Sequence, residues 1–566
     1  MSKNKFKQAS PVAPTAKQDP ITPDKGFAIP YPQLLLVAAV VLVYFPVFSF
    51  GYTELDDTIF IREFRAFNED LNNIFLAFGR GLFDAVKDPY YRPLFSDMMI
   101  LNYRLSGDMP GGYHFVNVVL HVVSVLLLYR LFTKLGIKAI HCFLLSLLFA
   151  VHPVLSQAVA WIPGRNDTLL AVFVLLFFLN SIAYTSTGKI NNLLLLALFL
   201  LLAYFTKETA VFAAPAAFAL LVLYKDTKIL DRNMYPQYAV WVLCFGVWYI
   251  ARSAATIQTS GIGSAQAFTD VLHRLPVVLQ YLGKIVLPFN LSVFPTQQDT
   301  VMYFGIMAHI TLVALVLLNK KANKKAIIGA GATFLLFLMP ALLVPDDLNR
   351  QTFEHRLYLP IIGILLILPH TLLFNSARTD KQITAIVVAI CILFAGINYR
   401  HQRNFESPVA FWSQAAATSP NSAYALMMLA ARLDKNEVKR SEQMFRQAYA
   451  LNPKEKYLNF YIAEMLQRKD SVLASEQYLL LEKKISDYIQ CDFYLARVAM
   501  EKRDPSGAIT HLQRYLNRDK YNPMANNNLL LLFVETNQVD KAKQQAQQMI
   551  RLGMEVPINI RRQFGI

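Results

Sequence analysis

Charged residues and cysteines are scarce in this chain. Asp, Glu, Lys and Arg make up 17% of the 566 residues, against roughly 25% in a typical soluble protein. Hydrophobic residues make up 55%, which excludes an ordinary water-soluble globule. Of the four cysteines, Cys142, Cys244 and Cys391 stand inside apolar runs and only Cys491 has polar surroundings. This count excludes a disulfide scaffold and argues against redox or cysteine-zinc chemistry.

Several common catalytic motifs are also missing. The sequence contains no Walker A loop, no Gly-x-Gly-x-x-Gly after a strand and no Gly-x-Ser-x-Gly elbow, so nucleotide binding and α/β-hydrolase chemistry have no support. His114 and His121 share a face of an expected helix. No cysteine or third histidine stands at ligand spacing, so polar contacts in the core explain this pair better than zinc does.

The positive charge is spread along the chain. The formal net charge is +16, but Lys and Arg occur in short clusters between apolar segments rather than on one domain, so we predict no nucleic-acid partner. A membrane explains the pattern better, because basic residues gather in the short cytoplasmic loops of membrane proteins.

Apolar segments recur that are long enough to cross a bilayer, which takes about 17 to 25 residues of helix. Residues 271–290 are apolar but interrupted by Arg274, Lys284 and two prolines, so we expect them to lie at the interface or re-enter. If the other segments cross alternately, every basic cluster falls on the side of residues 1–30, which we expect to be a disordered cytoplasmic tail. We predict eleven spans, at 33–50, 113–133, 139–160, 168–187, 191–206, 209–224, 237–252, 301–319, 326–345, 357–375 and 382–398.

Two polar parts lie on the other, outer side of this topology. The loop 51–112 carries ten acidic residues against six basic ones, the opposite of the bias expected inside. We expect a membrane domain over residues 31–405 that includes this loop, followed by a polar helical domain over residues 406–566.

The polar domain has the spacing of a repeat array. Three prolines follow the period of tetratricopeptide repeats (TPRs), which is ~34 residues. One period separates Pro420 from Pro453, and two periods separate Pro453 from Pro523. We therefore predict about four TPRs that stack into an α-solenoid with a concave groove. A docking or spacer role for this array is a better interpretation than chemistry of its own.

Adjacent carboxylates follow the first predicted span, at Asp56 and Asp57. Neighbouring side chains do not share a face of a helix or a strand, so we expect one of them to act and the other to orient it. The alternative is a purely structural role as the N-cap of the following segment, for which Asp is a favoured residue.

Further polar side chains stand at the outer ends of the other spans, where lipid would penalise them unless they had partners. Cations there are suited to a phosphate group, arginine as a bidentate fork and lysine as a point charge. Each cation taken alone is better explained as an interfacial side chain or an ion-pair partner, so only their convergence with Asp56 indicates a site. These residues are His152, Arg165, Asp167, Lys207, Glu208, Arg252, Glu354, His355, Arg356 and Tyr358.

Seven blocks, in this order, resemble the transmembrane glycosyltransferases with tetratricopeptide repeats, the group that includes the TPR-bearing transmembrane O-mannosyltransferases. The resemblance covers nearly the whole chain from about residue 31. The blocks are Leu55-Asp56-Asp57, Tyr91-Arg92-Pro93-Leu94, Tyr113 to His121, Phe149 to Val154, Gly164-Arg165-Asn166-Asp167, Thr206-Lys207-Glu208-Thr209 and Glu354 to Pro360.

The resemblance implies an all-α, polytopic GT-C membrane domain with a catalytic carboxylate in its first outer loop and a sugar donor linked to polyprenyl phosphate. It assigns catalysis to Asp56 and Asp57. A divalent cation, Mg or Mn, held through Asp57 and phosphate oxygens, stays open as a cofactor. The other roles that it implies are donor phosphate binding by Arg165, Lys207 and Arg356, and support by Arg92, His152, Asp167, Glu208, Glu354, His355 and Tyr358.

Two departures from the family pattern leave points open. Leu155-Ser156-Gln157 stands where we expect His-Thr-Glu, which puts an acidic role at that position in doubt. The repeat array is short, which leaves the type of substrate open. We expect an inverting glycosyltransferase that moves a sugar to a protein or glycan acceptor on the extracytoplasmic side, with the repeats binding the acceptor or a partner. The short array favours a bacterial inner-membrane protein with its repeats in the periplasm. The alternatives are a membrane-anchored TPR scaffold without activity, and a polysaccharide ligase or a transporter.

Overall fold

The structure, a computed structural model, describes residues 29–83, 89–256, 264–343, 351–374 and 378–566. The tail expected at 1–30 therefore lies outside the described residues, apart from its last two. Within these ranges every regular element is a helix, and the one strand-like contact is an isolated bridge between Thr296 and Gln351. The prediction of an all-α fold is confirmed.

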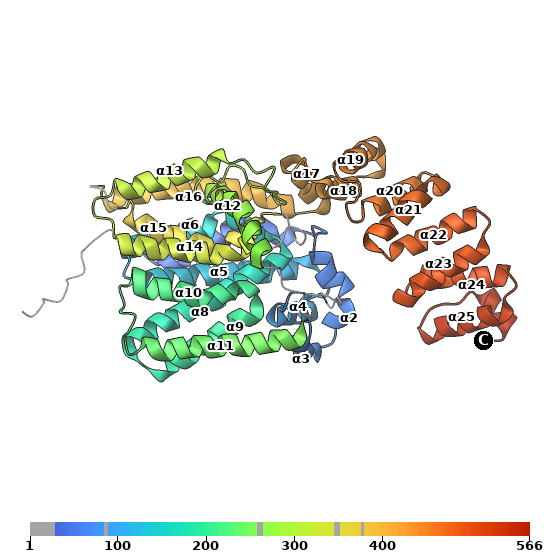
Figure 1. The fold of residues 1–566 in the computed structure, drawn as a ribbon, viewed down its shortest axis with the longest axis horizontal. Helices are drawn as coiled ribbons and strands as arrows, with labels where there is room; N and C mark the ends of the chain where they lie inside the picture. The colour runs from blue at the N-terminus through green and yellow to red at the C-terminus, as the bar shows by residue number, and fades with distance from the viewer. Residues whose placement is uncertain (1–28, 84–88, 257–263, 344–350, 375–377) are drawn as a thin grey trace, which may run out of the picture.

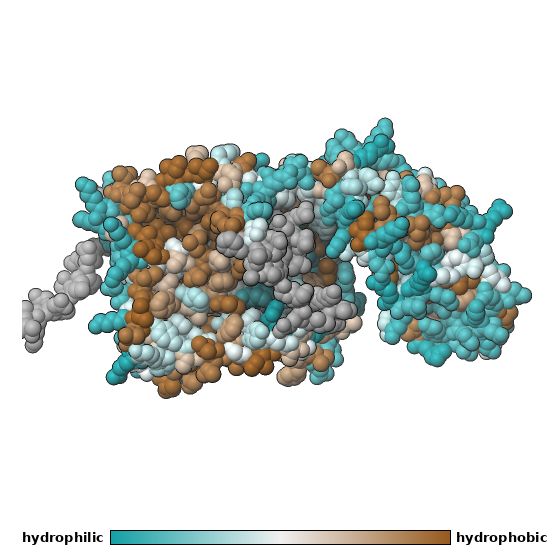
Figure 2. All heavy atoms as spheres, in the orientation of Figure 1, coloured by the Kyte–Doolittle hydropathy of each residue, from teal (hydrophilic) through white to brown (hydrophobic). Residues whose placement is uncertain are grey.

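The membrane part is a bundle of helices that run side by side along the long axis of the molecule (Figure 1). Hydrophobic side chains cover much of the bundle surface, whereas most of the repeat surface is hydrophilic (Figure 2). The helices are α1 (Pro32–Tyr44), η1 (Phe45–Ser49), α5 (Pro110–Lys134), α6 (Ala139–Val151), η4 (Pro153–Leu155), α7 (Ser156–Ala160), η5 (Ile162–Gly164), α8 (Arg165–Thr187), α9 (Ile190–Thr206), η6 (Glu208–Phe212), α10 (Ala213–Phe218), η7 (Ala219–Tyr224), α11 (Met234–Ala255), α12 (Ser264–Val286), α13 (Tyr303–Leu317), α14 (Lys324–Leu343), η8 (Glu354–Leu357), α15 (Pro360–Ile367), η9 (Leu368–His370), α16 (Asp380–Gln402) and η10 (Arg403–Phe405).

Length and composition single out the helices that can cross a membrane. Among the described residues, six helical segments are long and apolar enough, and a bent pair adds a seventh. Four shorter apolar segments, α9, α13, η6 to η7 and α15 with η9, do not reach this length. All eleven segments predicted from the sequence are thus apolar and helical, six or seven of them are long enough to cross, and the chain is a multi-pass membrane protein. That all eleven cross stays a prediction.

The bent pair has a covalent cause. Pro153 follows His152 directly, and a proline removes a backbone donor and clashes with the preceding turn, so α6 ends there. The chain resumes in η4 and α7 at an angle of 49°. The bend places the segment from His152 to Trp161 inside the bundle, where its side chains are buried.

Helix α12 covers most of residues 271–290 and is not among the candidate spans. Its polar residues point into the protein: Arg274 donates to the carbonyl of Ala341 at 3.1 Å and Lys284 pairs with Glu354. Gly283 allows a close approach to α13, since a Cβ there would lie 2.7 Å from the backbone nitrogen of Gly305.

The outer loop folds into short helices at one end of the bundle (Figure 1). Their apolar side chains form a small cluster of their own, centred on Phe60, Phe95 and Tyr113. The loop helices are η2 (Ile59–Glu63), α2 (Arg65–Asn68), α3 (Asn73–Leu76), η3 (Ala77–Gly79) and α4 (Pro93–Ser106).

The repeats extend from the same end of the bundle as the outer loop (Figure 1). After α17, four pairs of helices follow, and several begin at a side-chain cap and a proline, as Asn522 and Pro523 do for α24. The hydrophobic core of the membrane part continues without a break through α17 to α20. The helices are α17 (Pro408–Thr418), α18 (Ala423–Ala430), η11 (Lys435–Glu437), α19 (Val438–Leu451), α20 (Leu458–Arg468), α21 (Val472–Ser486), α22 (Gln490–Glu501), α23 (Pro505–Arg518), α24 (Pro523–Glu535), α25 (Val539–Arg551) and α26 (Ile558–Phe564).

Candidate active site

A cavity of about 640 Å³ lies where the ends of the membrane helices meet the outer loop. Residues from the loop after η1, from the starts of α4, α8 and η8, and from the ends of α9, α11 and α14 line it together. Its polar lining is Asp56, Tyr90, Arg92, Trp161, Asn166, Asp167, Lys207, Glu208, Thr209, Arg252, His355 and Arg356. Its apolar lining includes Phe60, Leu82, Phe83, Val211, Phe212, Phe337, Pro340, Ala341, Leu343, Phe353 and Leu359.

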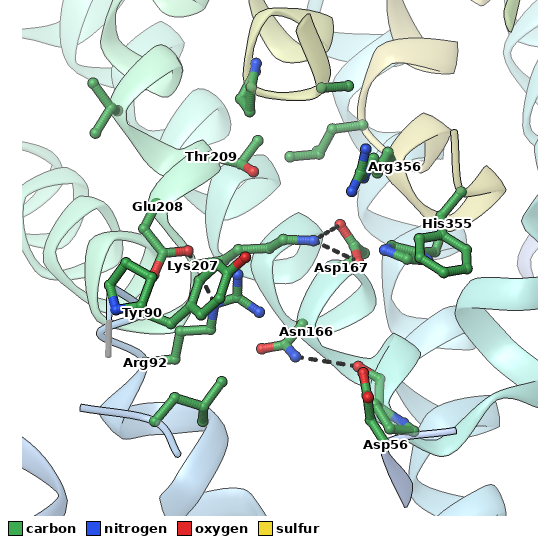
Figure 3. A pocket seen from close by; sticks show the side chains of 18 of the residues that line it. Asp56, Tyr90, Arg92, Asn166, Asp167, Lys207, Glu208, Thr209, His355 and Arg356 are labelled. Atoms are coloured by element: carbon green, nitrogen blue, oxygen red, sulfur yellow. Dashed lines mark hydrogen bonds and ion pairs between the residues drawn. The ribbon is translucent and has the colours of Figure 1, made fainter. Parts of the chain in front are cut away.

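Asp56 is the carboxylate of the outer loop that reaches the cavity (Figure 3). Burial raises its pKa to about 6, the charge of Asp57 adds to the rise, and Arg92 opposes it. Asp56 forms no ion pair with any residue that the structure describes. A carboxyl group that titrates near neutral pH in a polar cavity is suited to accept a proton during a reaction.

Asp57 points away from the cavity and holds the loop together. Its carboxylate accepts hydrogen bonds from the Thr53 amide at 2.6 Å, the Thr53 hydroxyl at 3.0 Å and the Thr58 amide at 3.0 Å. The side chain is almost fully buried. Asp57 therefore has a structural role, while its neighbour faces the site, but it is not the N-cap that sequence analysis gave as the alternative, because the N-cap of η2 is Thr58, without a side-chain cap bond.

Two of the cavity cations are paired with carboxylates. Lys207 donates to both carboxylate oxygens of Asp167, at 2.7 and 2.8 Å, across the cavity (Figure 3). Arg92 Nε lies 2.9 Å from Glu208 Oε2, and the Tyr91 amide donates to the other oxygen of Glu208 at 2.9 Å. These pairs tie α8 to α9, and α4 to the start of η6.

Arg356 and Arg252 line the same cavity without a carboxylate partner among the described residues. Arg356 donates to the carbonyl of Gln351 at 3.0 Å, and Arg252 donates to the carbonyl of Pro89 at 3.1 Å. Each guanidinium group has further N–H donors with which to bind an anion. The positive charges of Arg356 and Arg92 act on Lys207, whose pKa burial lowers and Asp167 raises.

His355 stands next to Arg356 in the cavity wall and is held by Gln157. The Gln157 side-chain oxygen accepts from the His355 amide at 3.0 Å, and its nitrogen donates to the Val293 carbonyl at 2.9 Å. Burial, and then the charges of Lys207 and Arg356, lower the pKa of His355 well below its usual value. The imidazole is therefore neutral and available as a hydrogen-bonding group.

Besides Asp57, four residues named from the sequence lie outside the cavity. Arg165 is fully buried and donates to Asn117 Oδ1 at 3.1 Å and to the Tyr113 carbonyl at 2.9 Å. His152 contacts the Ile285 carbonyl at 2.8 Å, and Tyr358 contacts His121 at 2.7 Å. Glu354 is enclosed by Lys284, Ser292 and His401. These side chains support the bundle, and Arg165 is not placed to touch a donor phosphate in the cavity.

Among the polar lining residues, Tyr90, Trp161, Asn166 and Thr209 had no role in the sequence analysis. Tyr90 lies beside Arg92, with the Arg92 guanidinium 4.7 Å from the centre of its ring. Asn166 donates to the Pro163 carbonyl at 3.2 Å, and its own side-chain oxygen is buried without a partner among the described residues. In the same part of the chain, the indole N–H of Trp161 is also buried and unpartnered. Asn166 stands inside one of the seven motif blocks, which is the signal that could have identified it.

Among the described residues, no three His, Cys, Asp or Glu side chains are grouped so that they could hold a metal ion. The oxygens of Asp57, the proposed metal ligand, are occupied by Thr53 and Thr58. These residues do not fit a bound divalent cation, so we derive no step of the reaction through one, and metal dependence stays a prediction.

Comparisons with known proteins agree with the motif blocks. Residues 89–250 match the family described as dolichyl-phosphate-mannose-protein mannosyltransferase. A protein O-mannosyl-transferase of Caenorhabditis elegans is 23% identical over 396 residues, which are 66% of this chain and 56% of that protein. The human protein O-mannosyl-transferase TMTC4 is 26% identical over 401 residues, 56% of this chain and 53% of that protein.

A shorter match is closer in sequence. The mouse protein O-mannosyl-transferase TMTC1 is 42% identical over 107 residues, which are 18% of this chain and 11% of that protein. The chain thus spans about half the length of the Caenorhabditis elegans protein and of human TMTC4. The resemblance to the TPR-bearing transmembrane O-mannosyltransferases is confirmed, and the chain is similar to membrane glycosyltransferases.

Proposed function

We propose that this chain transfers mannose from a polyprenyl-phosphate donor to a hydroxyl group of a protein acceptor. The observation that carries the proposal is a cavity at the end of the membrane helices in which Asp56 lies with Arg252 and Arg356. Glycosyl transfer needs a base for the acceptor and cations for the departing phosphate. The names of the relatives, protein O-mannosyl-transferases, support the sugar and the acceptor class.

In this proposal Asp56 is the general base. Its carboxylate takes the proton of the acceptor hydroxyl while the acceptor oxygen attacks the anomeric carbon. The bond from that carbon to the phosphate oxygen breaks on the opposite side, so the configuration inverts and the bond electrons stay with the phosphate. A carboxyl group with a pKa of about 6 is largely ionised at neutral pH and becomes protonated during transfer.

The donor phosphate is bound by Arg356 and Arg252. Both are arginines without a carboxylate partner among the described residues, and arginine binds phosphate through two parallel hydrogen bonds. Lys207 and Arg92 add positive potential even though Asp167 and Glu208 balance their charges. The apolar wall from Phe337 and Leu343 of α14 suits the first units of a prenyl chain, whose remainder stays in lipid.

We also propose that the cavity opens on the extracytoplasmic side. Lys138 pairs with Asp380 at 2.7 Å, and Lys325 pairs with Asp226 at 2.7 Å, so the basic loops gather together. These loops connect the helix ends away from the cavity, and basic loops stay cytoplasmic. The bacterial inner membrane, with the repeats in the periplasm, remains our proposal for the location.

The test is transfer of labelled mannose from polyprenyl-phosphate mannose to a Ser/Thr peptide by the purified full chain. Asp56→Asn should lower turnover by about 10²-fold or more, as loss of a general base does, and should leave the protein folded. Asp57→Asn is the matched control: it should lower the free energy of unfolding by about 1–3 kcal/mol and retain turnover in the protein that stays folded. If folded Asp56→Asn transfers at the wild-type rate, the catalytic assignment is wrong.

A further inference from the structure

Aromatic side chains form a continuous line from the cavity wall to the first repeat. Trp161 and Phe353 both line the cavity, and their ring centres are 6.3 Å apart. Phe353 contacts Phe294 at 5.5 Å, and Phe294 stacks on Tyr424 of α18 at 5.6 Å with an angle of 18° between the planes. The first repeat is therefore joined to the wall of the cavity through Phe294.

The charge of the proposed base also acts on Tyr424. Burial raises the pKa of its hydroxyl, and the charge of Asp56 is the next largest cause. The ring of Trp412 in α17 contacts Tyr424 at 5.7 Å. Because α17 to α20 share one core with the membrane helices, this arrangement is fixed rather than a chance contact between two loosely joined domains.

Three more tyrosines continue from Tyr424 along the repeats. Tyr461 lies on α20, Tyr457 at its start and Tyr488 just before α22. Tyr457 and Tyr488 are 4.9 Å apart, and Phe460 is 4.9 Å from Tyr488. We name Tyr424, Tyr457, Tyr461 and Tyr488 the tyrosine strip. Tyr457 is 36% exposed and the other three tyrosines are partly buried, so the strip is most open to a binding partner at Tyr457.

Acidic side chains of the outer loop act electrostatically on the tyrosine strip and contact the first repeat. The charge of Glu63 contributes to raising the pKa of both Tyr457 and Tyr488, after burial and nearer groups. Glu54 pairs with Arg432 of the first repeat at 3.0 Å, and the Trp412 indole donates to the Thr53 carbonyl at 3.1 Å. Beside this junction the loop and the more distant repeats are separated by open space (Figure 2).

The backbone is strained on both sides of the junction. Glu54 has φ of 56° and Tyr457 has φ of 71°, in the left-handed region that residues other than glycine rarely adopt. The Tyr457 amide donates to Glu482 Oε1 at 2.8 Å, which holds this conformation. Strain of this kind persists where surrounding contacts impose it, and it concentrates at binding sites.

We propose that the acceptor is an extended polypeptide with basic residues beside its Ser or Thr, and that it lies between the tyrosine strip and Glu54 and Glu63. This inference rests on the proposed function and adds the acceptor-binding surface to it. Tyrosine supplies a large rigid face at low entropic cost together with a hydroxyl for peptide groups, and TPR arrays present extended binding surfaces. Glu63, which forms no ion pair among the described residues, favours lysine or arginine in the acceptor, whereas Glu54 is already paired with Arg432 and helps to hold the first repeat against the loop.

The first test compares acceptor kinetics in the full chain. Tyr457→Ala with Tyr488→Ala should raise KM for a long Lys-flanked Ser/Thr peptide by about tenfold or more, the size of a binding hot spot. The value of kcat should not change, and a short acceptor that ends beside Asp56 should be unaffected. Tyr449→Ala with Tyr478→Ala is the matched control, because these rings also contact, at 6.3 Å, but lie on the second helices of their pairs, α19 and α21. Equal KM values in the two double variants would overturn the inference.

The second test does not depend on turnover. Binding of a fluorescent Lys-flanked peptide to the Asp56→Asn chain should weaken by about tenfold when Glu63→Gln and Tyr457→Ala are added. A Glu-flanked peptide should bind more weakly than the Lys-flanked one, and added salt should reduce the difference. If the wild-type chain transfers no sugar but binds the peptide in this way, the proposed function is wrong and the tyrosine strip is still a peptide-binding surface. If transfer occurs but both peptides bind alike, the tyrosine strip is not the acceptor site.

Discussion

At the scale of single residues, the chemistry depends on the protonation of Asp56. Its pKa of about 6 lies above the usual range because the side chain is buried next to Asp57. Only the carboxylate accepts a proton, so kcat/KM for transfer should fall about tenfold per pH unit below pH 6 and level off above it. Measuring kcat/KM of the wild-type chain over a pH series, with unfolding monitored at each pH, tests this fall, which we call the acid limb of the pH profile.

Arg92 offers a check that Asp56 is the group whose protonation lowers kcat/KM below pH 6. Its positive charge lowers the pKa of Asp56, so Arg92→Met should move the acid limb to higher pH. A limb that stays in place in this variant would mean that another group titrates.

The cavity cations should differ in what they contribute. Arg356 has no carboxylate partner among the described residues, so Arg356→Ala should raise KM for the donor about tenfold or more with little effect on stability. Lys207→Met leaves Asp167 buried and unpaired, which should destabilise the fold by about 3–5 kcal/mol. Donor titration and thermal unfolding in detergent separate the two effects. Adding Asp167→Asn to Lys207→Met should recover much of the lost stability, and no recovery would contradict the pairing.

Sequence analysis identified the right loops but not always the right side chain. Arg165 and Asp167 are two residues apart, so they point to opposite faces of α8: Asp167 lines the cavity and Arg165 binds Asn117 and Tyr113. Asp56 and Asp57 divide in the same way. Which side of a helix or turn faces the cavity depends on how that element packs in the bundle. The composition of a loop does not contain this information.

One departure from the family pattern has a physical explanation. Gln157 accepts a hydrogen bond from the His355 amide and donates one to the Val293 carbonyl. An amide can do both, whereas a carboxylate could only accept and would face the carbonyl oxygen of Val293 unpaired. The doubt that the sequence raised about an acidic role at this position is therefore resolved in favour of a structural one.

At the scale of elements, a buried ion cluster joins three helical segments behind the cavity. Glu354 of η8 pairs with Lys284 of α12 at 2.7 Å, accepts from the Ser292 amide at 2.7 Å and lies 3.3 Å from His401 of α16. The Lys284 and Glu354 side chains are 1% and 0% exposed. Glu354 directly precedes His355 and Arg356, so the cluster fixes where these two side chains enter the cavity.

Breaking this cluster should destabilise the whole membrane part. Glu354→Gln leaves the Lys284 charge buried without its partner, which should cost about 3–5 kcal/mol of the free energy of unfolding. Thermal unfolding in detergent measures the loss. Combining Glu354→Gln with Lys284→Met removes both charges and should recover part of it, so a double variant less stable than either single variant would argue against the pairing.

The helices themselves were largely predictable, since a span in lipid needs an uninterrupted apolar run whatever it packs against. The bend after α6 was less so: Pro153 explains why the helix stops, but not the 49° turn that brings Gln157 against His355. The polar residues of α12 correctly indicated a helix outside the set of spans. Their partners, Ala341 and Glu354, are far away in the sequence and could not be named.

At the scale of the whole molecule, the sequence indicated both parts but not how they join. The topology predicted that Asp56, Asp167, Lys207 and Arg356 would share one side of the membrane, and the structure brings them into one cavity. Nothing in the repeat pattern indicated that Arg432 would reach Glu54, or Trp412 the carbonyl of Thr53. Such contacts depend on the docking of one folded surface on another, which local periodicity does not report.

The orientation of the assembled molecule gives the last prediction. All four native cysteines are buried, so a single introduced cysteine will dominate labelling by a membrane-impermeant maleimide. Glu535 in the repeats and Lys321 in a basic loop are both exposed, and our topology places them on opposite sides of the membrane. Glu535→Cys should therefore react in sealed cells once any outer barrier is permeabilised, whereas Lys321→Cys should react only after lysis. The reverse pattern would place the cavity on the cytoplasmic side, where the donor would have to be presented from the inner leaflet.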